Sequence, residues 1–142
     1  MKASWIVLGV LVGVPACGSK DEAATGEGAT GTTSAKATEM SDAKKSLVEA
    51  WKKAGLTPSE MTASTAFGKD CNAATVNKID VVVCEFPSDD EAKKAEQPGL
   101  DWVGSTTGAA WVSGPLVIAV ADRKKADVTG KTINQLMKST PK

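Results

Sequence analysis

The residues best suited to chemistry in this chain are its three cysteines, Cys17, Cys71 and Cys84. The 142 residues include neither histidine nor tyrosine. This composition excludes imidazole acid–base catalysis, histidine-ligated metal sites and a Ser-His-Asp triad. A redox dithiol favours the close Cys-x-x-Cys spacing, which this chain lacks, and a metal site needs more soft ligands than two thiolates. We therefore expect no cofactor and no metal.

The first 16 residues have the pattern of an export signal. Met1 and Lys2 form a short positive end, and an uninterrupted apolar run covers residues 5–14. A membrane-spanning helix needs about 20 apolar residues, whereas the apolar core of a signal peptide has about 7–15. The pattern predicts that residues 1–16 are a signal peptide and not part of the folded domain.

The four residues Val14-Pro15-Ala16-Cys17 resemble the lipobox of bacterial lipoproteins, which ends in an invariant cysteine. In that family the cysteine thiol carries diacylglycerol, the signal is cleaved just before it, and the new amino terminus is acylated, for example with palmitate. The resemblance implies that Cys17 is lipidated and anchors the protein to a lipid bilayer, since two or more chains hold firmly. By analogy with sorting rules, Gly18 after the cysteine favours the outer membrane of the cell envelope.

Residues 17–40 read as the lipidated cysteine followed by a linker. From 18 onward they are almost wholly glycine, alanine, serine, threonine and charged residues. Such a composition cannot bury enough apolar surface to offset chain entropy, so we predict disorder. A flexible coil of this length spans about 25 Å on average. The remaining residues, 41–142, are predicted to form a single globular domain.

Local patterns predict an α+β fold for this domain. Helices are expected over 41–54, over 88–97 with an end at Pro98-Gly99, and over 129–138. Strands are expected over 61–67, 79–86, 108–113 and 116–121, with a further strand starting in 100–103. The stretch after Cys71 reads as a polar connection. Short turns between strands imply antiparallel pairing, so we predict a small sheet of about four strands with three helices packed on one face.

If Cys17 carries lipid, Cys71 and Cys84 have only one possible pairing. Disulfides persist in the oxidising space that an export signal implies. Closing a loop of about 14 residues removes roughly 3 kcal/mol of unfolded-chain entropy, which is a large share of the stability of a small domain. We predict a structural disulfide; two reduced buried thiols are the alternative if export fails.

Candidate ligand-binding residues are few. Trp102 and Trp111 flank the segment 104–108 and are weak candidates for an aromatic ligand surface, the alternative being that they pack on the sheet. The acidic run 89–91 suits helix capping better than a cation site. The basic run 123–125 is predicted to be a solvated turn. Lys44, Lys45, Lys52 and Lys53 are predicted near the outer face of the first helix, where solvation is favoured over contact with anionic lipid.

These observations predict a non-enzymatic, membrane-anchored lipoprotein of the bacterial cell envelope. Its disulfide-linked domain would act as a binding or structural module of unknown ligand, with an envelope protein as a candidate partner. The chain has 17 basic and 17 acidic residues, a balance that gives no support for nucleic-acid binding. The alternative is a small periplasmic enzyme or inhibitor with a serine or carboxylate site near residues 102–111.

Overall fold

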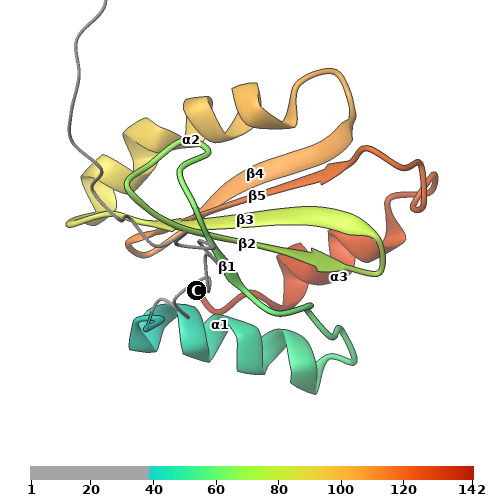
Figure 1. Ribbon diagram of the computed structural model, residues 1–142, viewed down its shortest axis with the longest axis horizontal. Helices are drawn as coiled ribbons and strands as arrows, with labels where there is room; N and C mark the ends of the chain where they lie inside the picture. Colours follow the sequence, from blue (N-terminus) through green and yellow to red (C-terminus); the bar gives the residue numbers. More distant parts are fainter. Residues whose placement is uncertain (1–38) are drawn as a thin grey trace, which may run out of the picture. The chain divides into compact units, whose positions relative to one another are not determined.

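A computed structural model describes residues 39–142, which form three helices and five strands (Figure 1). In chain order they are α1 (Asp42–Lys53), β1 (Thr62–Ser64), β2 (Asp70–Val76), β3 (Ile79–Glu85), α2 (Asp89–Val103), β4 (Thr107–Ser113), β5 (Leu116–Asp122) and α3 (Lys131–Ser139). The predicted α+β class is confirmed. The predicted signal peptide, Cys17 and nearly all of the predicted linker lie outside the described residues.

The five strands form one antiparallel sheet in the order β1-β2-β3-β5-β4. Helix α2 covers one face of this sheet, and α1 and α3 cover the other (Figure 1). The expectation that all helices cover one face was therefore wrong. The physical reason lies in the central strands: every residue of β5 is buried, so both of its faces need to be shielded from water.

Large aliphatic side chains fill the space between the sheet and the α1–α3 layer. The buried members of this core are Leu47, Trp51, Leu56, Val76, Ile79, Val81, Val83, Leu116, Ile118, Val120, Ile133 and Leu136. Trp51 is fully buried, and its indole N–H donates a hydrogen bond of 3.2 Å to the carbonyl of Leu136. This bond joins α1 directly to α3, so the two helices are fixed to each other as well as to the sheet.

On the opposite face of the sheet, the residues of α2 that pack against the strands are small. The buried residues of α2 are Ala92, Ala95, Gly99 and Val103. A Cβ placed on Gly99 would lie 3.2 Å from the Cβ of Ala110 and 3.3 Å from Cγ1 of Val117. The helix therefore lies close to β4 and β5 at this point, and Gly99 provides the room for that close approach.

The helix starts predicted from capping residues are confirmed. The Ser41 hydroxyl accepts the backbone N–H of Lys44 at 3.3 Å, and the Ser88 hydroxyl accepts that of Glu91 at 3.3 Å. Each hydroxyl satisfies one of the donors that the first turn of a helix leaves free. After α1, Gly55 has a φ of +80°, which is the left-handed conformation predicted for this position.

The prediction missed strand β2, which it took for a polar connection. Residues Asn77 and Lys78 have φ values of 50° and 71° and join β2 to β3 as a two-residue hairpin turn. The expected strand 61–67 is correspondingly shorter, since β1 ends at Ser64. Phe67 lies in the following loop and packs against all three small cores on the α2 side.

The predicted end of α2 at Pro98-Gly99 was also wrong. The helix continues through both residues to Val103, so the expected strand at 100–103 is its last turn. Gly104 then ends the helix with a φ of 66°, and its N–H donates to the carbonyl of Leu100 at 3.1 Å.

The described residues, 39–142, belong to one compact unit. All core residues described for it lie between Leu47 and Leu136. A fragment comprising residues 33–142 therefore contains the complete set of helices, strands and cores described here, and we expect it to fold without the preceding residues.

Candidate functional site

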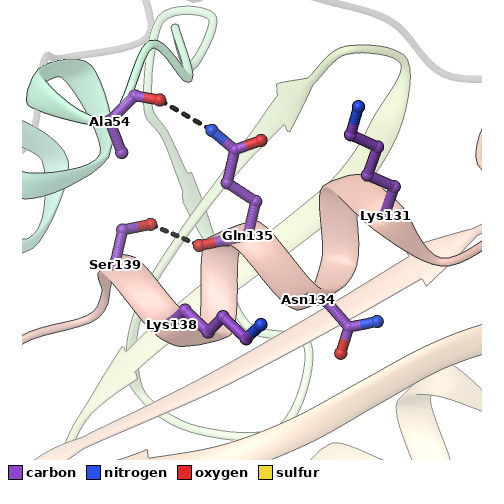
Figure 2. Close-up of a pocket in the computed structure, with 6 residues that line it drawn as sticks. All are labelled: Ala54, Lys131, Asn134, Gln135, Lys138 and Ser139. Atoms are coloured by element: carbon purple, nitrogen blue, oxygen red, sulfur yellow. Dashed lines mark hydrogen bonds between the residues drawn. The ribbon is translucent and has the colours of Figure 1, made fainter.

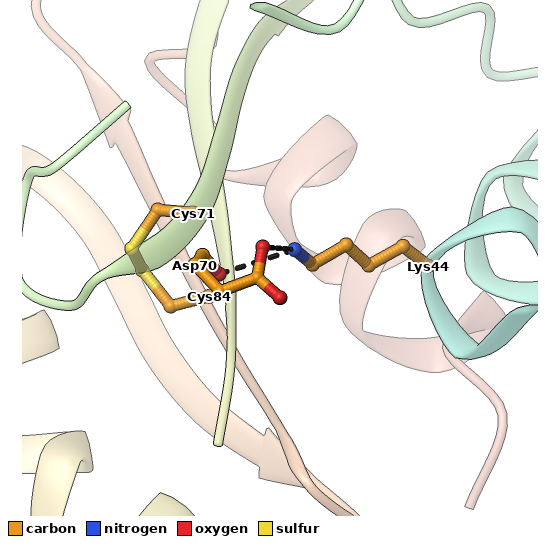
Figure 3. The surroundings of a disulfide bond; sticks show 4 residues. All are labelled: Lys44, Asp70, Cys71 and Cys84. Carbon is orange, nitrogen blue, oxygen red and sulfur yellow. Dashed lines mark hydrogen bonds and ion pairs between the residues drawn. A yellow bond between two sulfur atoms is a disulfide. The ribbon is translucent and has the colours of Figure 1, made fainter. Parts of the chain in front are cut away.

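The predicted disulfide joins neighbouring strands of the sheet. Cys71 on β2 lies directly opposite Cys84 on β3, with a Cα–Cα distance of 3.9 Å, and their sulfurs are bonded (Figure 3). Relative exposures are 3% for Cys71 and 0% for Cys84, so solvent does not reach this bond in the folded protein. The pairing prediction is confirmed, and the burial gives the bond a structural role.

Lys44 does not lie on a solvated face, as the sequence had suggested. Its side chain is 1% exposed, and its ammonium group donates to the Asp70 carboxylate at 2.5 Å and to the Asp70 carbonyl at 3.1 Å (Figure 3). The position is one turn before Val48, which is also buried, so the lysine stem lies against the sheet while its charge reaches an exposed acid. This contact holds α1 to β2 next to the disulfide.

Trp102 and Trp111 lie on opposite faces of the sheet. Trp102 packs against the core that contains Val82, on the α2 side. Trp111 packs against the large core on the α1–α3 side. The two side chains therefore do not line one groove.

Arg123 lies in an exposed turn after β5, as expected, but three groups contact its side chain. Its guanidinium lies 4.8 Å from the centroid of the Trp102 ring. It also donates to the Trp102 carbonyl at 2.8 Å and lies 3.6 Å from the Asp80 carboxylate. These contacts fix the end of β5 against the end of α2.

The polar groups around residues 102–111 make local structural contacts. Thr106 donates its hydroxyl to the carbonyl of Val103 at 2.8 Å, and Gln97 donates to the Asp101 carboxylate at 3.0 Å. Within residues 39–142, every hydrogen bond of a serine hydroxyl is made with a backbone group. In the same range there is no group of three or more cysteine or acidic residues that could hold a metal ion.

Strand β4 forms one edge of the sheet and pairs only with β5. Its seven residues, Thr107–Ser113, carry no charge. The hairpin turn that follows contains two residues, Gly114 and Pro115. The residues that flank such a turn, here Ser113 and Leu116, form a hydrogen-bonded pair. By the alternation of antiparallel pairing, the backbone groups of Gly108, Ala110 and Val112 point away from β5. They form a row of donors and acceptors suited to another strand.

Exposed apolar side chains lie on both sides of this edge. The large exposed hydrophobic residues among those described are Leu100, Val128 and Met137. Leu100 comes two positions before Trp102, and two positions correspond to about 200° around a helix. Because Trp102 faces β3, Leu100 faces the opposite side of α2, which is the side of β4. Met137 on α3 lines a groove together with Trp111. Two of the three exposed hydrophobic residues thus flank the free edge.

The groove beside β4 has a volume of about 700 Å³ and is lined by Trp111, Val112, Ser113, Met137, Lys138 and Lys142, among others. The indole N–H of Trp111 is buried with no acceptor among the described residues. The lining is apolar at Trp111 and Met137, and Lys138 and Lys142 add positive charge. We call β4 together with this groove and Leu100 the β4 edge site.

Two buried aspartates place α3 beside β4. The carboxylate of Asp122 accepts the backbone N–H groups of Ala126 and Asp127, each at 2.7 Å. The carboxylate of Asp127 in turn accepts the N–H of Ile133 at 3.0 Å in the first turn of α3. Because Gly130 has no side chain to cap this helix, Asp127 does so. Neither the two aspartates nor the β4 edge site was predicted from the sequence, where the uncharged run 107–113 was the signal available for the edge.

Comparison of the chain with models of protein families, with curated proteins and with solved structures returned no match. None of the helices formed by residues 39–142 is long and apolar enough to cross a membrane.

Proposed function

We propose that this protein is a lipid-anchored lipoprotein of the bacterial cell envelope whose domain binds an extended segment of an envelope protein. The segment would add as a sixth strand to β4. The observation that carries this proposal is the uncharged free edge of β4 with exposed apolar side chains on both sides. Edge strands that remain free usually carry charged side chains that oppose pairing, and β4 carries none.

Strand addition determines the chemistry of the partner. Main-chain hydrogen bonds to the outward groups of β4 give affinity, and alternate side chains of the added strand give specificity. On the α3 side, an apolar side chain would enter the groove between Trp111 and Met137. Lys138 and Lys142 favour a partner with an acidic residue or a carboxyl terminus next to that side chain. On the α2 side, a second apolar side chain would contact Leu100.

Two observations support the envelope location. The residues Val14–Cys17 resemble a lipobox, and the disulfide between Cys71 and Cys84 is of a kind that persists in oxidising compartments. The edge opposite β4 is β1, with only three residues, so β4 offers the longer free edge for a partner.

A library of random linear peptides displayed on phage and selected on fragment 33–142 tests strand addition. We expect the selected peptides to perturb the amide NMR signals of Gly108, Ala110 and Val112 most strongly, because these groups point away from β5. Ala110→Pro removes one outward donor while leaving the bonds to β5 in place, as proline is tolerated on a free edge. It is expected to weaken peptide binding at least about tenfold.

Substitutions of the exposed apolar residues beside β4 test the same site and can be compared with a matched control. Leu100→Glu and Met137→Glu are each expected to weaken peptide binding by roughly tenfold. Val128→Glu replaces an even more exposed apolar residue that is not part of the β4 edge site, and it should have no effect. Selection that yields no binding peptide, or peptides that bind all four variants as tightly as the parent fragment, would show that β4 is not a strand-addition site.

Lipidation of Cys17 is tested separately, in cells. After feeding with an alkyne-labelled palmitate, the parent protein is expected to carry the label and Cys17→Ser to lack it, because the acyl chains depend on that thiol. Ser19→Ala keeps the cysteine and serves as the matched control, which should be labelled. Label on Cys17→Ser, or a parent protein that is unlabelled and begins at Met1, contradicts the anchor.

A further inference from the structure

The two helical layers of the domain carry opposite charge. Helices α1 and α3 together have five exposed lysines, Lys45, Lys52, Lys53, Lys131 and Lys138, and two acidic residues, Asp42 and Glu49. These residues sum to +3; the sixth lysine, Lys44, is buried and paired with Asp70 of β2. Helix α2 has two lysines, Lys93 and Lys94, and five acidic residues, Asp89, Asp90, Glu91, Glu96 and Asp101, a net charge of −3. Because these layers lie on opposite faces of the sheet (Figure 1), the domain is electrically polar although the whole chain is neutral.

The lysines of α3 stand next to the end of α1. Lys131 and Lys138 are two helical turns apart on α3, and with Asn134 and Gln135 they line a hollow that also includes Ala54 at the end of α1 (Figure 2). The carbonyl of Ala54 accepts the side-chain N–H of Gln135 at 2.7 Å, so α3 contacts the end of α1 here (Figure 2). Lys52 and Lys53 immediately precede Ala54 in α1 and are exposed, so the two helices that meet here carry four exposed lysines between them.

These four lysines do not form ion pairs within the folded domain. Among the ion pairs within residues 39–142, none involves Lys52, Lys53, Lys131 or Lys138. Lys44 differs from them, since it is buried and paired with Asp70. Unpaired lysines on the α1–α3 layer attract this face of the domain to a negatively charged surface. The acidic α2 layer would be repelled by the same surface, so it opposes binding with α2 toward that surface.

We propose that the α1–α3 layer is a docking surface for anionic phospholipid headgroups, and that it orients the domain with α2 away from the bilayer. Asp42, the first residue of α1, comes 25 residues after Cys17, so the layer is tied to the chain close to the proposed anchor. The biological setting rests on the proposed lipidation, which keeps the layer near lipid at high effective concentration. In this orientation the backbone edge of β4 points sideways, along the bilayer surface, and Lys138 is shared between the docking layer and the β4 edge site.

Vesicle sedimentation of fragment 33–142, which lacks Cys17, tests this surface independently of the anchor and of peptide binding. We expect binding to vesicles of phosphatidylcholine and phosphatidylglycerol at low salt, little binding to pure phosphatidylcholine, and loss of binding at high salt because exposed charges are screened. The variant Lys52→Gln/Lys53→Gln/Lys131→Gln should lower the partition coefficient at least about tenfold, since each lysine near an anionic surface contributes several-fold.

A variant with the same change in net charge provides the control. Lys69→Gln/Lys93→Gln/Lys94→Gln removes three exposed lysines outside the α1–α3 layer, and it should bind phosphatidylglycerol vesicles as the parent does. Circular dichroism confirms that both variants are folded. Equal losses in the two variants, or a parent fragment that does not bind phosphatidylglycerol at low salt, overturn the docking surface, whatever the outcome of the Cys17 and peptide experiments.

Discussion

Loss of the Cys71–Cys84 bond is expected to lower the free energy of unfolding of fragment 33–142 by about 3 kcal/mol. The bond links β2 to β3 across 13 positions of sequence, and it stabilises the fold mainly by restricting the unfolded chain. A loss of this size is a large fraction of the 5–15 kcal/mol typical of small domains. Urea unfolding of the oxidised and the reduced fragment measures it.

Two proteins that lack the disulfide distinguish the effect of the cross-link on stability from the effect of side-chain packing. The reduced parent keeps both side chains, whereas Cys71→Ala/Cys84→Ala also removes buried atoms and should be less stable still. Because both sulfurs are buried, reduction in the absence of urea should be slow. The prediction fails if the oxidised fragment is not lighter than the reduced one by the mass of two hydrogen atoms, or if reduction leaves its stability unchanged.

Gly108→Ala is expected to destabilise the domain by about 3 kcal/mol. A Cβ at this position would collide with the carbonyl oxygen of Val120 and lie 2.5 Å from Cγ1 of Val103. The first neighbour is backbone of the paired strand, which cannot move without disturbing the sheet. At roughly 4–8 °C per kcal/mol for a domain of this size, the melting temperature should fall by more than about 10 °C.

Thr107→Ala is the matched control for this substitution. Thr107 is the exposed neighbour of Gly108 on the same edge strand, and its replacement should change stability by no more than about 0.5 kcal/mol. Differential scanning calorimetry of both variants measures the difference. A Gly108→Ala protein that melts within a few degrees of Thr107→Ala would show that α2 and β5 can separate to admit a methyl group.

Signals confined to a few neighbouring residues predicted most of the helices and strands. Ser41 and Ser88 marked helix starts because a hydroxyl can satisfy the first turn without help from distant parts of the chain. Strand β2 was missed because it contains asparagine, aspartate and alanine, which have low preference for strands. Its conformation comes from its position between β1 and β3 and from the bond at Cys71, which are contacts between separate strands.

The end of α2 shows the same division between local and tertiary causes. Proline and glycine together predict the end of a helix, yet Pro98 is exposed and Gly99 is the buried contact with β4 and β5. The close packing at Gly99, and the burial of Val103 one turn later, offset the local cost of both residues. A sequence pattern does not reveal these neighbours.

The candidate site could be predicted only in part. The strand 108–113 was expected, but its place at the sheet edge depends on β5 pairing with β3, which the sequence did not reveal. Trp111 was a candidate, whereas Met137 and Leu100 became part of the site only through the helix positions around it. The opposite placement of Trp102 follows from the last turn of α2, which had been taken for a strand.

The two faces of the sheet are packed with side chains of different size: large ones toward α1 and α3, and mostly small ones on α2. The buried residues of α2 are alanine, glycine and valine, which bury less apolar area per residue than the tryptophan, leucine and isoleucine behind the other face. We expect α2 to be held by less free energy, although Phe67, Phe86 and Trp102 add aromatic contacts on its side. We therefore expect sub-global opening to start with detachment of α2, while α1, α3 and the cross-linked hairpin stay folded. Such a partly opened state would uncover the alanine-rich face of β5 and remove Leu100 from the β4 edge site without releasing the lysine-bearing layer.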